Sequence, residues 1–97
     1  MLFAVHALDR PNCLALRAQH REAHIAFLTD AGDRLKFAGP LLDDAGGMCG
    51  SLLILEAENR ATLARWLEDD PYSAAGLFER VTIRAVKPLF GPMAAAL

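Results

Sequence analysis

The segment WLEDDPYSAAGLFERV, residues 66–81, contains the end of one expected helix and leads into a strand. Pro71 disfavours helical geometry in the residue before it, so we expect the helix to end near Asp70. Asp69 and Asp70 then lie at the negative end of a helix dipole, which costs a few tenths of a kcal/mol to about one. The two aspartates are therefore either a solvated helix stop, or one of them has a partner elsewhere in the chain.

Four short apolar runs bounded by turn residues predict β-strands. They are residues 2–9, 34–41, 49–57 and 80–86. Apolar residues at helical spacing predict two helices, one over residues 13–31 and one from Asn59 to about Asp70. Asn12 and Asn59 immediately precede these stretches, and we expect both to act as N-caps. Residues 88–97 have no regular period, so we expect an irregular tail.

The order β-α-β-β-α-β is that of the split βαβ, or ferredoxin-like, fold of the α+β class. In this fold both helices cover one face of a four-stranded antiparallel sheet. The 97 residues, of which 54% are apolar, are enough for one domain, 1–97, and too few for a second core. Residues 2–9 and 49–57 are apolar on both faces, whereas strands with one wet face alternate. A second sheet would cover that apolar face, so we expect a face-to-face homodimer.

The overall composition excludes several kinds of partner. The net charge is -2 and the basic residues are dispersed, so the chain lacks the basic stripe that nucleic-acid binding requires. No apolar run approaches the roughly 18 residues that span a bilayer. The first ten residues have no basic n-region, and Cys13 and Cys49 are isolated thiols without a CxxC pattern. We expect a soluble cytoplasmic protein that does not interact with membranes.

His20 and His24 lie four residues apart on the first expected helix and share a face, as two metal ligands would. Their pattern is HxExH and differs from the HExxH of zinc proteases. Nothing in the sequence fixes a third ligand. We therefore expect no metal and no other cofactor.

Arg21 and His24 are i,i+3 neighbours on the same helix. A nearby guanidinium disfavours the imidazolium form, which would keep the ring neutral and able to act as a base near pH 7. The alternative is that both residues face water. Gly39-Pro40 and Gly50-Ser51 are equally open to two interpretations, because small residues serve turns and also let a ligand approach the backbone.

Four stretches that occur in order resemble the YCII-related family over nearly the whole chain up to the tail. They are REAHIAFL, AGPLLDD, GSLLILEA and WLEDDPYSAAGLFERVTI. The resemblance implies a ferredoxin-like fold that dimerises into an α/β barrel. It also implies an active site formed by a histidine of the first helix and the aspartate of a DP motif. These are His24 and Asp70 here, with Arg21, Gly39-Pro40 and Ser51 as companions in the pocket.

The resemblance implies an enzyme, or enzyme-like protein, that acts on a small organic molecule. His24 would be the general acid or base, Asp70 would fix its tautomer, and Arg21 would help to bind an anionic or phenolic oxygen. One member of the family is a dehydrochlorinase, so elimination of the lyase type is the first reaction to consider. The alternative is a non-catalytic dimeric module that binds a small ligand or a partner protein. An exposed His24 far from Asp70 would favour that module.

Overall fold

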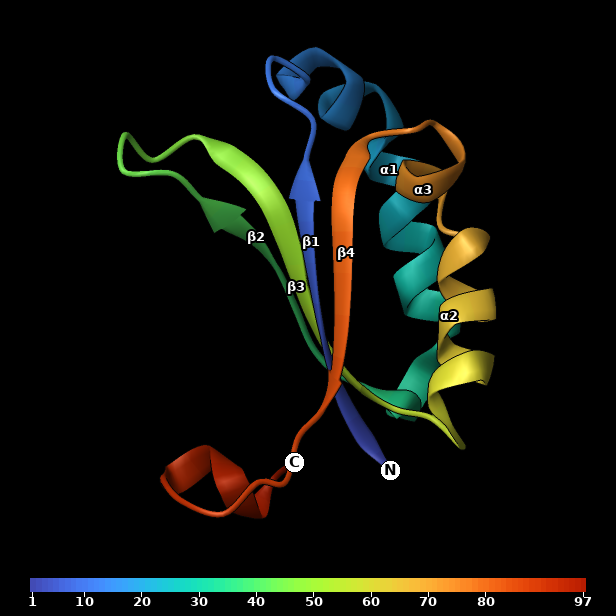
Figure 1. The fold of residues 1–97 in the computed structure, drawn as a ribbon, viewed down its shortest axis with the longest axis vertical. Helices are drawn as coiled ribbons and strands as arrows, with labels where there is room; N and C mark the ends of the chain where they lie inside the picture. Colours follow the sequence, from blue (N-terminus) through green and yellow to red (C-terminus); the bar gives the residue numbers. More distant parts are fainter.

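The computed structural model describes residues 1–97 as a four-stranded antiparallel sheet with helices on one face (Figure 1). The strand order across the sheet is β2-β3-β1-β4. The strands are β1 (Leu2–Asp9), β2 (Leu35–Leu42), β3 (Met48–Glu56) and β4 (Phe78–Ala85). All three pairings are antiparallel, and the two central strands, β1 and β3, are the two most apolar ones. The predicted ferredoxin-like α+β fold is confirmed.

The hydrophobic core lies between this sheet and the helices α1 (Leu14–Asp30) and α2 (Arg60–Glu68), with the short α3 (Pro71–Ala74) between α2 and β4. Both long helices lie on the same side of the sheet in Figure 1. Alternate residues of the strands point toward them, as the period of two requires. The buried residues of the core cluster are Phe3, Val5, Leu53, Leu55, Leu63, Leu67 and Ile83.

Only one of the two expected asparagine caps is present. Asn59 is the N-cap of α2, and its side-chain oxygen accepts a hydrogen bond from the backbone N–H of Thr62 at 2.8 Å. The N-cap of α1 is instead Cys13, which makes no side-chain cap bond. Asn12 was wrongly predicted as a cap, because it occupies the left-handed region at φ 61° in the turn before the helix. Asparagine tolerates that conformation better than most residues.

The segment of residues 66–81 places its two aspartates at different helix ends. α2 ends at Glu68, and Asp69 is its C-cap. Asp70 is the N-cap of α3, where its Oδ1 accepts a hydrogen bond from the backbone N–H of Tyr72 at 3.0 Å. A carboxylate is favoured at a helix start, so the unfavourable dipole position expected for Asp70 applies to Asp69 alone.

The face of the sheet opposite the helices, here called the open face, has no layer packed on it. Its central side chains are half-buried or exposed, and they are Ala4, His6, Leu8, Leu52 and Ile54. Glycine is required at Gly50 in β3, because a Cβ there would collide with the backbone oxygen of Ala7 on the neighbouring strand. None of the helices has the length and apolar character needed to cross a bilayer.

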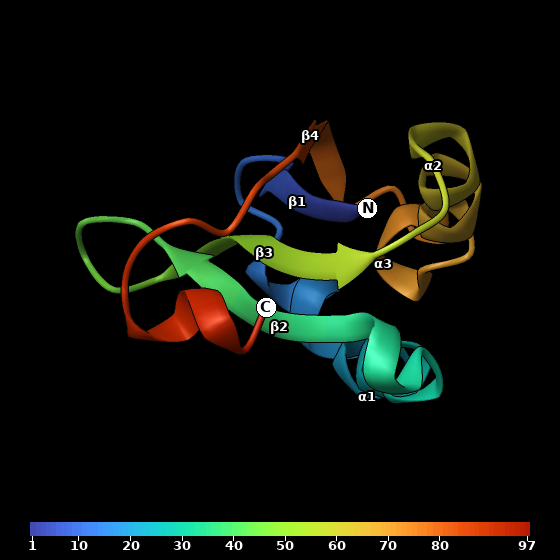
Figure 2. The ribbon, with the colours of Figure 1, turned by 90° about the horizontal axis from the view of Figure 1, so that it is seen from below.

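The C-terminal tail leaves the end of β4 and runs beyond the end of the sheet toward the β2 side (Figures 1 and 2). It contains a short 3-10 helix at Pro92–Ala95, where an entirely irregular segment was expected. Leu89 and Phe90 in this tail are exposed.

Candidate active site

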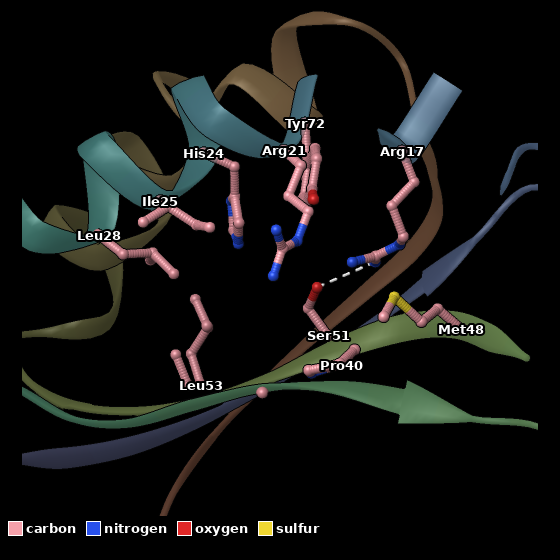
Figure 3. Close-up of a pocket in the computed structure, with 12 residues that line it drawn as sticks. Arg17, Arg21, His24, Ile25, Leu28, Pro40, Met48, Ser51, Leu53 and Tyr72 are labelled. Atoms are coloured by element: carbon pink, nitrogen blue, oxygen red, sulfur yellow. Dashed lines mark hydrogen bonds between the residues drawn. The ribbon is translucent and has the colours of Figure 1, made fainter. Parts of the chain in front are cut away.

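His24 of α1 and Asp70 at the start of α3 form a buried pair. The distance from His24 Nδ1 to Asp70 Oδ1 is 2.8 Å, and the two residues are 7% and 0% exposed. The predicted contact is confirmed. Because a carboxylate can only accept a hydrogen bond, Nδ1 donates to Asp70, and in the neutral ring this leaves a lone pair on Nε2. Figure 3 shows the ring pointing into the cavity between α1 and the sheet.

The two oxygens of Asp70 have different surroundings. Oδ1 accepts from both His24 and the backbone N–H of Tyr72. Oδ2 is buried and has no hydrogen-bond partner in the protein. Asp70 also lines a small enclosed space together with Ser51 and Ser73. An unsatisfied buried acceptor is unfavourable, so the carboxylate is held in place by the contacts of Oδ1 and by the turn around Pro71.

Tyr72 fixes the orientation of the imidazole. The rings of His24 and Tyr72 are stacked, with centroids 3.9 Å apart and an interplanar angle of 16°. The guanidinium carbon of Arg17 lies 4.7 Å from the centroid of the Tyr72 ring, and Phe78 contacts the tyrosine in an edge arrangement. The imidazole is thus restrained by the hydrogen bond at Nδ1 and by stacking on its face.

The phenol of Tyr72 remains protonated well above neutral pH. Burial raises its pKa, the charges of Arg17 and Arg21 lower it, and the charge of Asp70 raises it, so that the net pKa lies above the usual value. Tyr72 lines the cavity with the two arginines. At neutral pH its hydroxyl group is therefore able to donate a hydrogen bond to a bound molecule.

Arg17 of α1 forms a buried ion pair with Asp9 at the end of β1. Its Nε lies 2.7 Å from Asp9 Oδ2 and its Nη2 lies 2.8 Å from Asp9 Oδ1. Burial lowers the pKa of Arg17, but the hydrogen bonds and charge of Asp9 raise it more, so the guanidinium stays charged. Nη2 also donates to Ser51 Oγ at 3.0 Å, the dashed contact in Figure 3.

These side chains surround a cavity of about 210 Å³. The cavity is lined by the predicted residues Arg21, His24, Gly39, Pro40 and Ser51, and Asp70 lies behind His24. Apolar side chains complete its walls, namely Ile25, Leu28, Ala38, Met48 and Leu53. All the residues proposed for the site from the sequence are thus brought together. Their roles stay predictions.

Sequence reasoning missed Arg17, Asp9 and Tyr72. A signal for Arg17 was present, because it precedes Arg21 by four residues and His24 by seven and so shares their helix face. Asp9 and Tyr72 gave no comparable signal, since their positions depend on how β1 and α3 approach α1. His20 is half-buried, and no group of three or more His, Cys, Asp or Glu side chains is arranged to hold a metal ion.

The fold and the site together define a ferredoxin-like α+β protein with a buried histidine–aspartate pair facing a cavity. The model of the YCII-related domain matches residues 1–87. The chain therefore belongs to the YCII-related family.

Relatives of nearly equal length support this assignment. Protein YciI of Escherichia coli O6:H1 is 37% identical over 99 residues, which cover 93% of this chain and 100% of that protein. A protein of Haemophilus influenzae is 36% identical over 98 residues, with the same coverage of both chains.

Two solved structures resemble the chain to different degrees. The 5-chloro-2-hydroxyhydroquinone dehydrochlorinase TftG of Burkholderia phenoliruptrix AC1100, in complex with 2,5-dihydroxybenzoquinone, superposes with a TM-score of 0.85. It is 35% identical, and the match covers 90% of this chain and 94% of that chain. Protein Atu4242 of Agrobacterium tumefaciens has a TM-score of 0.57 at 17% identity, over 95% of this chain and 98% of that chain. This second likeness shows the fold alone.

We predict that Tyr72 titrates above the usual tyrosine range. The chain has one tyrosine, so a tyrosinate absorbance titration of the folded protein reports this residue alone, and the same titration in urea supplies the unfolded reference. The proton on Tyr72 contributes stability that is complete below the unfolded pKa of about 10 and is lost as the pH rises through the folded value. Circular dichroism at each pH verifies folding. A folded midpoint at or below the unfolded one would contradict the described environment.

Proposed function

We propose that the chain is an acid–base enzyme that acts on a small organic molecule bound in the cavity, with His24 and Asp70 as its catalytic pair. The observation that carries this proposal is the buried hydrogen bond from Nδ1 to the carboxylate, which leaves Nε2 directed toward the cavity. An exposed histidine far from Asp70 would have favoured a non-catalytic binding module. The observed burial argues against that alternative.

In the proposed mechanism, Nε2 of His24 removes a proton from the bound molecule. The imidazolium that forms is stabilised by Asp70, which also keeps the ring in the required tautomer before the reaction. The stack with Tyr72 prevents the ring from rotating away from the substrate. In an elimination, the electron pair of the broken bond to hydrogen forms a double bond while the leaving group departs with its own bonding pair.

Elimination is the reaction class that the comparisons favour. TftG is named a dehydrochlorinase and was solved with 2,5-dihydroxybenzoquinone, and it is 35% identical to this chain. The cavity here, of about 210 Å³, suits a molecule about the size of a single substituted ring. Arg21 and Ser51 would bind its oxygens, while Gly39 and Pro40 of β2 would border it from the sheet.

We also propose that the chain forms a homodimer through the open face. Both central strands present apolar side chains there, among them Leu52 and Ile54 of β3. A second copy packed face to face would bury these residues and produce the α/β barrel that the resemblance to the YCII-related family implies.

Removing His24 should lower the rate of the proposed reaction by a factor on the order of 10²–10⁴, the range for general acid–base catalysis. The assay is chloride release from 5-chloro-2-hydroxyhydroquinone by His24→Ala. Asp70→Asn should keep the fold and lose activity, since it removes the charge that holds the tautomer. His20→Ala is the matched control, because His20 lies on the same helix but does not line the cavity. Full activity in His24→Ala would contradict the role of His24, whereas a wild type that binds the compound and releases no chloride would favour the binding module.

The proposed dimer should bury roughly 1,200–2,000 Å² in total, the standard interface size. Sedimentation at micromolar concentration should therefore give the mass of two chains. Leu52→Glu should shift the protein to a monomer, because it places a charge at the centre of the open face. Leu14→Glu, which alters an exposed leucine of α1, should leave the dimer intact. A wild-type monomer at this concentration would contradict the proposed homodimer through the open face.

A further inference from the structure

The C-terminal tail carries apolar side chains that its own chain leaves uncovered. Leu89 is 79% exposed, Phe90 is 97% exposed and Met93 is 60% exposed. Single exposed apolar residues are common on protein surfaces, but three in so short a segment form a cluster of the kind that marks an interaction site. The model of the YCII-related domain ends at residue 87, so all three lie beyond it.

The part of the tail that carries Phe90 is conformationally restricted. Pro88 and Pro92 lie on either side of it, and each proline ring fixes its own φ angle. Gly91 has φ 94°, a conformation that side chains disfavour, and it turns the chain into the 3-10 helix at Pro92–Ala95. A restricted segment loses less conformational entropy on binding than a free end does. The tail is therefore suited to present the aromatic ring to a binding surface.

A groove of about 400 Å³, here called the edge groove, lies between the end of α1 and the start of β2. Most of its lining is apolar, and the lining residues are Ile25, Leu28, Thr29, Gly32, Leu35, Lys36, Phe37 and Ala38. Three of them, Ile25, Leu28 and Ala38, also line the cavity that contains His24. A side chain bound in the edge groove would therefore support one wall of that cavity.

The proposed homodimer brings the tail of one protomer to the edge groove of the other. β2 and β4 are the two edges of the sheet. A two-fold axis parallel to the strands closes the barrel by placing each β2 edge beside the β4 edge of the second copy. Because β2 runs parallel to β1 and β4 runs antiparallel to it, β4 ends where β2 begins. The tail of the second copy thus leaves its strand close to Leu35, at the edge groove.

The tail also has the direction and the length for this contact. Figures 1 and 2 show it leaving β4 on the side away from the helices, where the second copy would pack. Phe90 follows Ala85, the last residue of β4, by five positions. Five extended residues span at most roughly 17 Å, whereas neighbouring strands are about 5 Å apart. The ring can therefore pass the β2 edge and enter the groove beside α1.

We propose that Leu89 and Phe90 of each protomer bind in the edge groove of the other protomer, so that a second copy of the chain completes the wall of each cavity. Phe90 is then a positioning residue, which holds Ile25 and Leu28 in place. This inference rests on the proposed homodimer and is independent of the catalytic role of His24. It adds the occupant of the edge groove and a route by which one protomer shapes the cavity of the other.

The direct test is photo-crosslinking from position 90. The variant Phe90→p-benzoylphenylalanine is incubated with wild-type chains labelled with heavy nitrogen until the subunits exchange. Irradiation should join an unlabelled chain to a labelled one, and mass spectrometry of the peptides should place the cross-link within residues 25–38. Leu14→p-benzoylphenylalanine is the matched control, because Leu14 is also an exposed apolar residue but lies at the start of α1.

A second test measures dimer dissociation by sedimentation over a dilution series. Phe90→Ala should raise the dissociation constant at least about 10-fold for each of the two buried rings. Thr29→Arg should have a similar effect, because it fills the edge groove from a position that does not line the cavity. Gln19→Arg adds the same charge elsewhere on α1 and should leave the constant unchanged. The effects of Phe90→Ala and Thr29→Arg should not add, since both remove one contact.

Cross-links confined to a single chain, cross-links to the open face, or a yield no greater than that of the Leu14 control would each overturn the inference. So would a dissociation constant in Phe90→Ala equal to that of the wild type. The proposals fail separately. A wild-type dimer whose cross-links miss the edge groove would keep the homodimer and remove the docking of the tail. A wild-type monomer would remove both, and the catalytic pair would still be decided by His24→Ala.

Discussion

A single carboxylate oxygen, Oδ1 of Asp70, joins the parts of the molecule that form the site. It accepts a hydrogen bond from the backbone at the start of α3 and another from His24 in the middle of α1. The first contact sets the turn that separates α2 from α3, and the second ties that turn to the neighbouring helix. Because Tyr72 supplies the first contact and also stacks on His24, the local turn and the imidazole cannot move independently.

The arrangement gives the cavity two chemically distinct sides. On one side the imidazole presents a lone pair, supported by a carboxylate that is itself fully buried. On the other side Asp9 holds the guanidinium of Arg17, which donates a hydrogen bond to Ser51. Each cavity-facing group is thus held by a second group behind it, and rigid positioning of this kind is what electrostatic stabilisation of a developing charge requires.

The sequence predicted the fold because its signals are local. Short apolar runs, helical spacing and Pro71 determine where elements begin and end, and the order of elements then leaves few topologies. The pairing of His24 with Asp70 came from the family resemblance, since helix register is not a local property. Asn12 was misassigned because a left-handed turn and an N-cap favour the same residue type. Asp9 and Tyr72 were missed because only the packed structure brings them to Arg17.

In the proposed mechanism, Asp70 holds His24 in the tautomer with the proton on Nδ1 and an unprotonated Nε2. The most direct measurement is nitrogen NMR of the imidazole side chains at neutral pH. The chain has three histidines, so variants of His6 and His20 assign the remaining signal to His24. We expect a protonated Nδ1 and an unprotonated Nε2 for His24 in the wild type, with this preference lost in Asp70→Asn. A His24 ring protonated on Nε2 alone in the wild type would contradict it.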